Sequence, residues 1–175
     1  SIGHNGSLLL NFPIMPNGLI NERDEKAALD FAKAVKESFA VNLAIKAKAD
    51  ASNVRGKAKE FAAFNAIDGN KDSYWATDDN VNTASLTIDF GKNVLFNRFV
   101  VQEYIRLGQR VKAFSIEAFV DGQWKEIAKA TTIGYKRILR FSSVNASKVR
   151  MNITDSKSCP VISNIGVYNA PLILD

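Results

Sequence analysis

The sequence is poor in the residues that build cross-links and metal centres. Cys159 is the only cysteine among 175 residues, and His4 is the only histidine. One cysteine excludes a disulfide within the chain and a cysteine-based zinc site. One histidine excludes a cluster of histidine ligands. The longest apolar run falls far short of the roughly 20 residues that a membrane-spanning helix requires, so we expect no such span.

The chain is basic overall, with a net charge of +5 and a pI near 9.3. Sites for single-stranded nucleic acid combine basic residues with aromatic side chains that stack on the bases. The densest basic stretch has no aromatic residue before Phe61, which favours a solvated strand and loop surface over nucleic-acid binding. That stretch contains Lys46, Lys48, Arg55, Lys57 and Lys59.

Two hydrophobic periods divide the chain near residues 40 to 43. Residues 22–39 carry apolar side chains at helical spacing, and Asn21 is a candidate N-cap before an acidic first turn. Asp121-Gly122 joins two later runs and predicts a tight hairpin. We therefore expect a β-sandwich over residues 41–175, preceded by a separate unit over residues 1–40. The sandwich prediction rests on period-two alternation, which is typical of strands, at residues 86–90, 114–120 and 149–153.

The pattern of the N-terminal unit does not suit a sandwich. Leu8-Leu9-Leu10 is an unbroken apolar run of the kind found in strands buried on both faces. A loop rich in proline and glycine follows over residues 11–18, and the predicted helix comes next. One strand, one loop and one helix form the repeating unit of an α/β barrel, whose other units are absent here. Since the chain also begins without methionine, we expect an internal piece of a longer protein.

One segment of the second unit gathers oxygen-bearing side chains in a short turn. It runs over residues 67–77 with the sequence IDGNKDSYWAT, which favours a sharp turn and offers hard oxygen ligands for Ca²⁺. Together with the alternating strands and PVISNIGVY at residues 160–168, it resembles the discoidin-like domain, also called the coagulation-factor-type C domain. The resemblance covers roughly residues 41–170. It implies a mainly β, antiparallel jelly-roll sandwich, and many members of that family bind carbohydrate.

The N-terminal unit adds a more specific resemblance, to one family of enzymes. Its sequence SIGHNGSLLLN at residues 1–11, followed by GLI at residues 18–20, resembles the end of the catalytic barrel in α-L-fucosidases of glycoside hydrolase family 29. Many relatives continue into a discoidin-like domain with segments similar to QEYIRLGQRV at residues 102–111 and TIGYKRI at residues 132–138. One departure is Pro13-Ile14, where such fucosidases often carry two adjacent prolines.

The resemblance implies a non-catalytic C-terminal fragment of a retaining α-L-fucosidase that is secreted, periplasmic or on the cell surface. Retaining glycosidases need two carboxyl groups about 5 Å apart, and in this family both come from earlier barrel strands. The fragment would bind glycan or brace the missing catalytic barrel of the same chain. The alternative is a stand-alone adhesion or interaction module with no enzyme attached, and an upstream barrel in the reading frame would separate the two.

The two fucosidase-like segments carry six candidate site residues. Their long polar or aromatic side chains suit contacts to sugar, contacts to the barrel, or hydrogen bonds within their own loops, and the sequence leaves these three roles open. The six are Arg106, Gln109, Arg110, Tyr135, Lys136 and Arg137.

The expected cofactor is a structural calcium ion, whose ligands the family pattern implies around the oxygen-rich turn. A glutamate near the C-terminus often completes that site, and Asn164 stands in its position here. A neutral amide in place of a carboxylate weakens Ca²⁺ binding, and an Asx-turn without metal is the alternative. The implied ligands are Asn65, Asp68, Asn70, Ser73 and Asn164.

The remaining expectations concern burial and association. Trp75 and Cys159 are predicted core residues, and His4 is a predicted solvated turn residue. The resemblance implies that the helix packs against other barrel elements in the parent protein, and these are absent from this sequence. Its apolar stripe should therefore dock on the sandwich or pair with a second copy to give a dimer. The leucine run is expected to add to a sheet edge. The helix stripe comprises Phe31, Val35 and Phe39.

Overall fold

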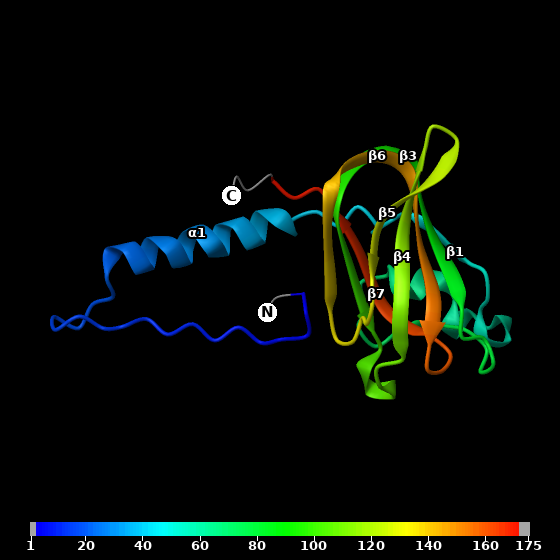
Figure 1. Ribbon diagram of the computed structural model, residues 1–175, viewed down its shortest axis with the longest axis horizontal. Coiled ribbons are helices and arrows are strands. Elements are labelled where there is room, and N and C mark those ends of the chain that lie inside the picture. The colour runs from blue at the N-terminus through cyan, green and yellow to red at the C-terminus, as the bar shows by residue number, and fades with distance from the viewer. Residues whose placement is uncertain (1–2, 172–175) are drawn as a thin grey trace.

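The computed structural model describes residues 3–171, which form a β-sandwich and an N-terminal arm over residues 3–40 (Figure 1). In the arm, an extended stretch leads away from the sandwich, and helix α1 (Glu22–Ser38) leads back to it. The mainly β architecture with one preceding helix confirms the predicted fold class. Among the described residues, no helix has the length and apolar character needed to cross a membrane.

Helix α1 is stabilised at both ends. The side chain of Asn21 caps the first turn, because its Oδ1 accepts a hydrogen bond from the amide of Arg23 at 3.0 Å. Acidic residues in the first turn complement the helix dipole. Phe39 is the C-cap residue after the helix, and its amide donates to the carbonyl of Val35 at 3.3 Å. The predicted helix is confirmed, including its N-cap.

The sandwich is a single hydrogen-bonded network of antiparallel strands in the order β2-β7-β3-β6-β4-β5, with β1 paired to β3. Four 3-10 helices interrupt the loops at Arg55–Lys57, Lys59–Phe61, Ala63–Ala66 and Ile105–Leu107. The strands are β1 (Lys48–Ala51), β2 (Trp75–Ala76), β3 (Ala84–Glu103), β4 (Val111–Val120), β5 (Gln123–Ala130), β6 (Arg137–Ser156) and β7 (Val161–Tyr168).

Strands β3 and β6 are each 20 residues long and extend through both layers of the sandwich. Their pairing shifts register between Asp89 and Val94 and again between Phe96 and Arg98. Such shifts are typical of bulges that bend strands. Before the first shift β3 pairs with β1, and after it β3 pairs with β7. Figure 1 shows both strands arching over the top of the sandwich.

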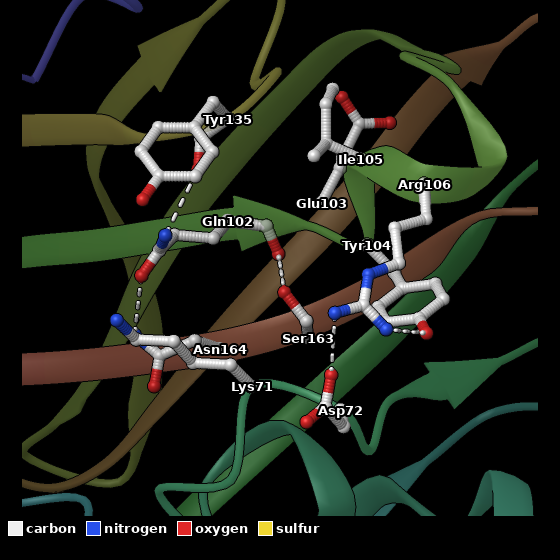
Figure 2. A pocket seen from close by; sticks show the side chains of 10 residues that line it. All are labelled: Lys71, Asp72, Gln102, Glu103, Tyr104, Ile105, Arg106, Tyr135, Ser163 and Asn164. Carbon is white, nitrogen blue, oxygen red and sulfur yellow. Dashed lines mark hydrogen bonds and ion pairs between the residues drawn. The ribbon is translucent and has the colours of Figure 1, made fainter.

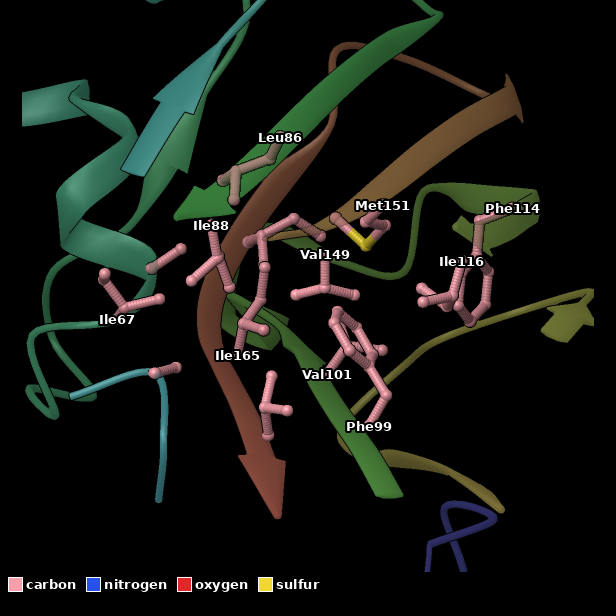
Figure 3. Packing of buried hydrophobic residues seen from close by; sticks show 14 of the residues in the cluster. Ile67, Leu86, Ile88, Phe99, Val101, Phe114, Ile116, Val149, Met151 and Ile165 are labelled. Carbon is pink, nitrogen blue, oxygen red and sulfur yellow. The ribbon is translucent and has the colours of Figure 1, made fainter. Parts of the chain in front are cut away.

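The core lies between the layers and is built from the inward-facing positions of the alternating runs (Figure 3). Ile116 of β4 and Ile165 of β7 are fully buried there. Trp75 is 0% exposed, and its Nε1 donates to the carbonyl of Asn53 at 2.9 Å. Cys159 is also buried. The predicted core positions of Trp75 and Cys159 are therefore confirmed.

The leucine run of the N-terminal arm is exposed and forms no strand within residues 3–171. Leu9 is 85% exposed, and its neighbours Leu8 and Leu10 are about half exposed. The arm leads away from the sandwich at this point (Figure 1), and residues 8–10 pair with none of the described strands. The expectation that this run adds to a sheet edge is therefore wrong.

Candidate functional site

The N-terminal arm meets the sandwich at the start of β6. The carbonyl of Gly3 accepts a hydrogen bond from the amide of Ile138 at 3.0 Å, and the amide of Asn5 donates to the carbonyl of Lys136 at 3.3 Å. Between these two contacts, His4 pairs with residue 137 as an isolated antiparallel bridge. Residues 3–5 thus lie alongside the beginning of β6 like a short added strand. We call this contact, with residues 133–138, the arm junction.

The side chain of Asn5 holds the turn that precedes β6. Its Nδ2 donates to the carbonyl of Ile133 at 2.9 Å, and its Oδ1 accepts from the amide of Lys136 at 2.8 Å. Gly134 lies between these two residues with a φ of +66°. A Cβ added to Gly134 would lie 2.6 Å from the Asn5 Nδ2, so this turn requires glycine for both its conformation and its close approach.

Glu103, at the end of β3, connects the arm junction to the neighbouring loop. It is 2% exposed, and its Oε2 accepts a hydrogen bond from the amide of Gly134 at 2.7 Å. Its Oε1 accepts from the amides of Arg110 and Val111 at 2.7 and 2.8 Å. Sequence reasoning did not single out this residue. The signal was present, because Phe99, residue 101 and Glu103 continue one inward-facing period-two series.

The end of helix α1 is attached to β7 by a second set of contacts. The rings of Phe39 and Tyr168 meet edge to face with centroids 5.1 Å apart. The amide of Leu43 donates to the carbonyl of Val167 at 2.8 Å, and the Oδ1 of Asn42 accepts from the amide of Val167 at 3.0 Å. Burial raises the pKa of Tyr168 above its usual range. The expectation that the helix stripe docks on the sandwich is thus met at its C-terminal end.

Three of the six predicted site residues lie at the arm junction. The Nη1 of Arg137 is 3.0 Å from the Nδ1 of His4, and the Nε of Arg137 is buried without a hydrogen-bond partner among the described residues. Lys136 bonds to Asn5 through its backbone. Tyr135 is 56% exposed beside them. His4 is exposed, as predicted, although its ring contacts the guanidinium group of Arg137.

The other three predicted residues have separate roles. Arg110 makes internal hydrogen bonds, with its Nη1 donating to the carbonyl of Cys159 at 2.9 Å and its Nε to that of Leu107 at 3.3 Å. Arg106 forms an ion pair with Asp72 at 3.0 Å on the surface. Gln109 is exposed in the loop between them. The structure therefore does not gather the six residues into one site.

A cavity of about 170 Å³ opens beside the arm junction (Figure 2). Gln102 joins two of its walls, because its Nε2 donates to the carbonyl of Tyr135 at 3.0 Å and its Oε1 accepts from the Nδ2 of Asn164 at 3.1 Å. The Arg106–Asp72 ion pair lies at another side of the cavity. The lining residues are Lys71, Asp72, Gln102, Glu103, Tyr104, Ile105, Arg106, Tyr135, Ser163 and Asn164.

The oxygen-rich turn around Asp68 is held together by its own hydrogen bonds. The Oδ1 of Asp68 accepts from the amide of Asn70 at 2.7 Å, and its Oδ2 accepts from the hydroxyl of Ser73 at 2.6 Å. The Ser73 hydroxyl also lies 3.1 Å from the carbonyl oxygen of Asn70. This is the pattern of an Asx-turn. Three of the five implied calcium ligands are therefore adjacent to one another.

The other two implied ligands direct their amide nitrogens to different partners. The Nδ2 of Asn65 donates to the carbonyl of Glu60 at 2.7 Å, and that of Asn164 donates to Gln102. In the part of the chain that the structure describes, no three acidic, histidine or cysteine side chains gather as metal ligands. The five residues fit a calcium site only in part, with Asp68 as the one carboxylate. The calcium site stays a prediction.

Comparison with known proteins identifies the sandwich. The sequence model of the F5/8 type C domain matches residues 47–165. The chain belongs to this family. The α-L-fucosidase 1 of Arabidopsis thaliana is 35% identical over 172 residues, which are 96% of this chain and 34% of that protein. The chain thus spans about a third of the length of the curated relatives it matches.

Solved structures of two glycoside hydrolase family 29 proteins are similar to the N-terminal arm as well as to the sandwich. The family 29 fucosidase of Ruminococcus gnavus in complex with fucose is 34% identical, with a TM-score of 0.90 over 98% of this chain and 35% of its own. A glycoside hydrolase 29 family member from an unknown rumen bacterium is 38% identical, with a TM-score of 0.76 over 99% of this chain and 27% of its own. A Paenibacillus chitosan-binding module at 23% identity and TM-score 0.66 shares the fold alone.

Proposed function

We propose that this chain is the non-catalytic C-terminal part of a retaining α-L-fucosidase and that its discoidin-like domain braces the catalytic barrel. The observation that carries this proposal is the arm junction, where Asn5 bonds to both ends of the turn before β6. Among the described residues, the arm with its exposed leucines contacts the sandwich at residues 3–5 and at the end of α1. Its likeness to fucosidases three times as long supports a barrel as the missing neighbour.

The test of this proposal needs the polypeptide that carries this segment together with its upstream region. We expect that polypeptide to release nitrophenol from an aryl α-L-fucoside and to yield fucose with retained anomeric configuration, measured by NMR at early times. The 175-residue chain alone should release none. Turnover by the purified 175-residue chain, abolished by one substitution within it, would contradict the proposal. An upstream region without a barrel would favour an adhesion module instead.

A second candidate function is glycan binding at the cavity of Figure 2. The observation that favours it is the exposed ring of Tyr135 beside the amide groups of Gln102 and Asn164. An aromatic face with nearby hydrogen-bonding groups suits a sugar ring, which presents both C–H and hydroxyl groups. Arg106 at the same cavity adds a charged donor, although its ion pair with Asp72 must be kept or exchanged on binding.

Titration of the chain with fucosylated oligosaccharides, followed by NMR shifts, tests this second function. We expect shifts at Gln102 and Asn164, and a dissociation constant raised about tenfold by Tyr135→Ala. Phe64→Ala is the matched control, since Phe64 is a similarly exposed aromatic residue that does not line the cavity. Equal dissociation constants for the two variants would contradict glycan binding at this cavity.

A further inference from the structure

A second cavity, of about 470 Å³, lies on the side of the sandwich that carries β1, away from α1 (Figure 1). We call it the β1 cavity. Its volume falls in the range of about 300–1,000 Å³ that is typical of small-molecule sites. It shares no lining residue with the cavity of Figure 2. The lining residues are Ala51, Ser52, Asn53, Val54, Lys57, Ala58, Lys59, Ala62 and Asp78.

Part of the lining is an ordered polar network around Asp78. Its Oδ2 accepts from the Nδ2 of Asn53 at 2.9 Å, and its Oδ1 accepts from the amide of Gly56 at 2.8 Å. The hydrogen bond from Gly56, and then that from Asn53, hold the pKa of Asp78 below its ordinary 3.8, so the carboxylate is ionised at neutral pH. The Oγ of Ser52 accepts from the amide of Ser85 at 2.9 Å, which leaves its hydroxyl proton to donate.

Lys57 and Lys59 add two positive charges to the β1 cavity. Both side chains are exposed, and neither ammonium group forms an ion pair or a hydrogen bond within the described chain. Arg55, in the same basic stretch, is engaged elsewhere: its Nε donates to the carbonyl of Thr77 at 3.1 Å, and it forms an ion pair with Asp79. The cavity thus holds two cations against one carboxylate, which favours a ligand with an anionic group.

The backbone of Lys57 is strained. Its φ is +52°, and it follows Gly56, whose φ is +55°. This left-handed region is unfavourable for a residue with a Cβ, whereas glycine adopts it readily. Strained positions of this kind cluster at ligand sites. The turn itself would be better served by glycine, so the lysine side chain contributes something that the fold does not require.

We propose that the β1 cavity binds a sugar unit that carries one acidic group, either a carboxylate or a sulfate ester. The acidic group accepts charge-assisted hydrogen bonds from Lys57 and Lys59. The ring hydroxyl groups bond to Asp78 and Ser52, since each carboxylate oxygen accepts more than one hydrogen bond. The C–H face of the ring lies on the apolar side chains of the lining. This inference goes beyond the proposed function, because it holds whether or not the parent is a fucosidase.

Titration of the 175-residue chain, followed by the NMR shifts of the Lys57 and Lys59 amides, tests this inference. The probes are galacturonic acid, galactose-6-sulfate, galactose and inorganic sulfate. We expect at least one of the two acidic sugars to bind about tenfold more tightly than galactose and than inorganic sulfate. The tighter of the two identifies the acidic group. Galactose or inorganic sulfate binding as tightly as both acidic sugars would overturn the inference.

Two glycine variants separate binding at the cavity from a general effect of charge. Lys57→Gly removes the ammonium group and relieves the positive φ, so this variant should fold, while its dissociation constant for the acidic sugar rises about tenfold. Lys46→Gly is the matched control, because Lys46 is also exposed and has a φ of +72°, but does not line the cavity. Its dissociation constant should be unchanged.

Lys59→Gln is a second variant, which should weaken binding by a similar factor without any change of backbone strain. Equal dissociation constants for Lys57→Gly and Lys46→Gly would overturn the inference. So would a thymidine oligonucleotide that shifts the same amides at a lower concentration than either acidic sugar, since that result would assign the lysines to nucleic acid.

Discussion

The carboxylate of Glu103 accepts a hydrogen bond from the amide of Gly134 at 2.7 Å, while the carbonyl of Gly134 accepts one from the amide of Glu103 at 3.0 Å. This reciprocal pair joins the end of β3 to the turn before β6. The side chain of Asn5 forms hydrogen bonds to the same turn. The contact between the arm and the sandwich thus rests on a buried glutamate rather than on the exposed basic residues around it.

Glu103→Ala should destabilise the chain strongly. It leaves the buried backbone amides of Gly134 and Val111, and the partly buried amide of Arg110, without their acceptor. We expect the free energy of unfolding to fall by about 3 kcal/mol in urea denaturation. Glu126→Ala, at an exposed position of β5, is the control and should change it by about 0.5 kcal/mol or less. Equal effects of the two substitutions would contradict this role of Glu103.

The exposed groove of the arm should make the isolated chain self-associate. Leu8, Leu10 and Phe31 line an exposed apolar surface, which the barrel of the proposed parent enzyme would cover. Sedimentation should show a concentration-dependent dimer, which Phe31→Asp weakens. Leu29→Asp is the control, because Leu29 is exposed on the same helix but does not line the groove. A wild-type chain that stays monomeric at high concentration would contradict self-association through the groove.

Calcium should stabilise the chain through the turn around Asp68. A ligand that binds only the folded state adds about 2.7 kcal/mol at a hundredfold excess over its dissociation constant. We therefore expect calcium to raise the melting temperature of metal-stripped chain, and Asp68→Ala to abolish the rise. Asn164→Glu should enlarge it by restoring a carboxylate. Identical melting curves with calcium and with EDTA would exclude an exchangeable site.

Acid should weaken the sheet at Glu117. Burial opposes its ionised form, but hydrogen bonds from Asn152 and Arg150 outweigh burial and hold the pKa of Glu117 below its ordinary 4.5. A lowered folded-state pKa adds stability that is present above pH 4.5 and is lost as the pH falls through the folded value. In Glu117→Gln, the free energy of unfolding, measured in urea, should fall less between neutral and acidic pH than it does in the wild type. Glu126→Gln should leave it unchanged.

Local patterns in the sequence predicted the elements of the fold well. Asp121-Gly122 forms the expected hairpin, with β4 and β5 paired directly across it from Val120 to Gln123. Both turn residues have positive φ, at 53° and 78°, which is the conformation that Asp-Gly favours. These features depend on neighbouring residues alone, so one sequence is enough to predict them.

Features that depend on distant pairing were harder to predict. The alternating runs 86–90 and 149–153 suggested short strands, whereas they are parts of the 20-residue strands β3 and β6. The six candidate residues shared a chemistry but not a location, since Arg110 bonds to the carbonyl of Cys159, 49 positions away. Period two places Glu103 on the inward face after Phe99, but its role was missed because its partners, the amides of Arg110, Val111 and Gly134, lie 7 to 31 positions away in the sequence.

Hydrogen exchange at two backbone amides tests the arm junction most directly. The amide of Lys136 donates to the Oδ1 of Asn5, and that of Ile138 donates to the carbonyl of Gly3. Both amides should be protected in the 175-residue chain and exchange rapidly in a version that begins at Val41. The amide of Phe99, in the core strand β3, should stay protected in both versions and so report an intact sandwich. Equal protection of Lys136 and Ile138 in the two versions would contradict the account that the arm is anchored there.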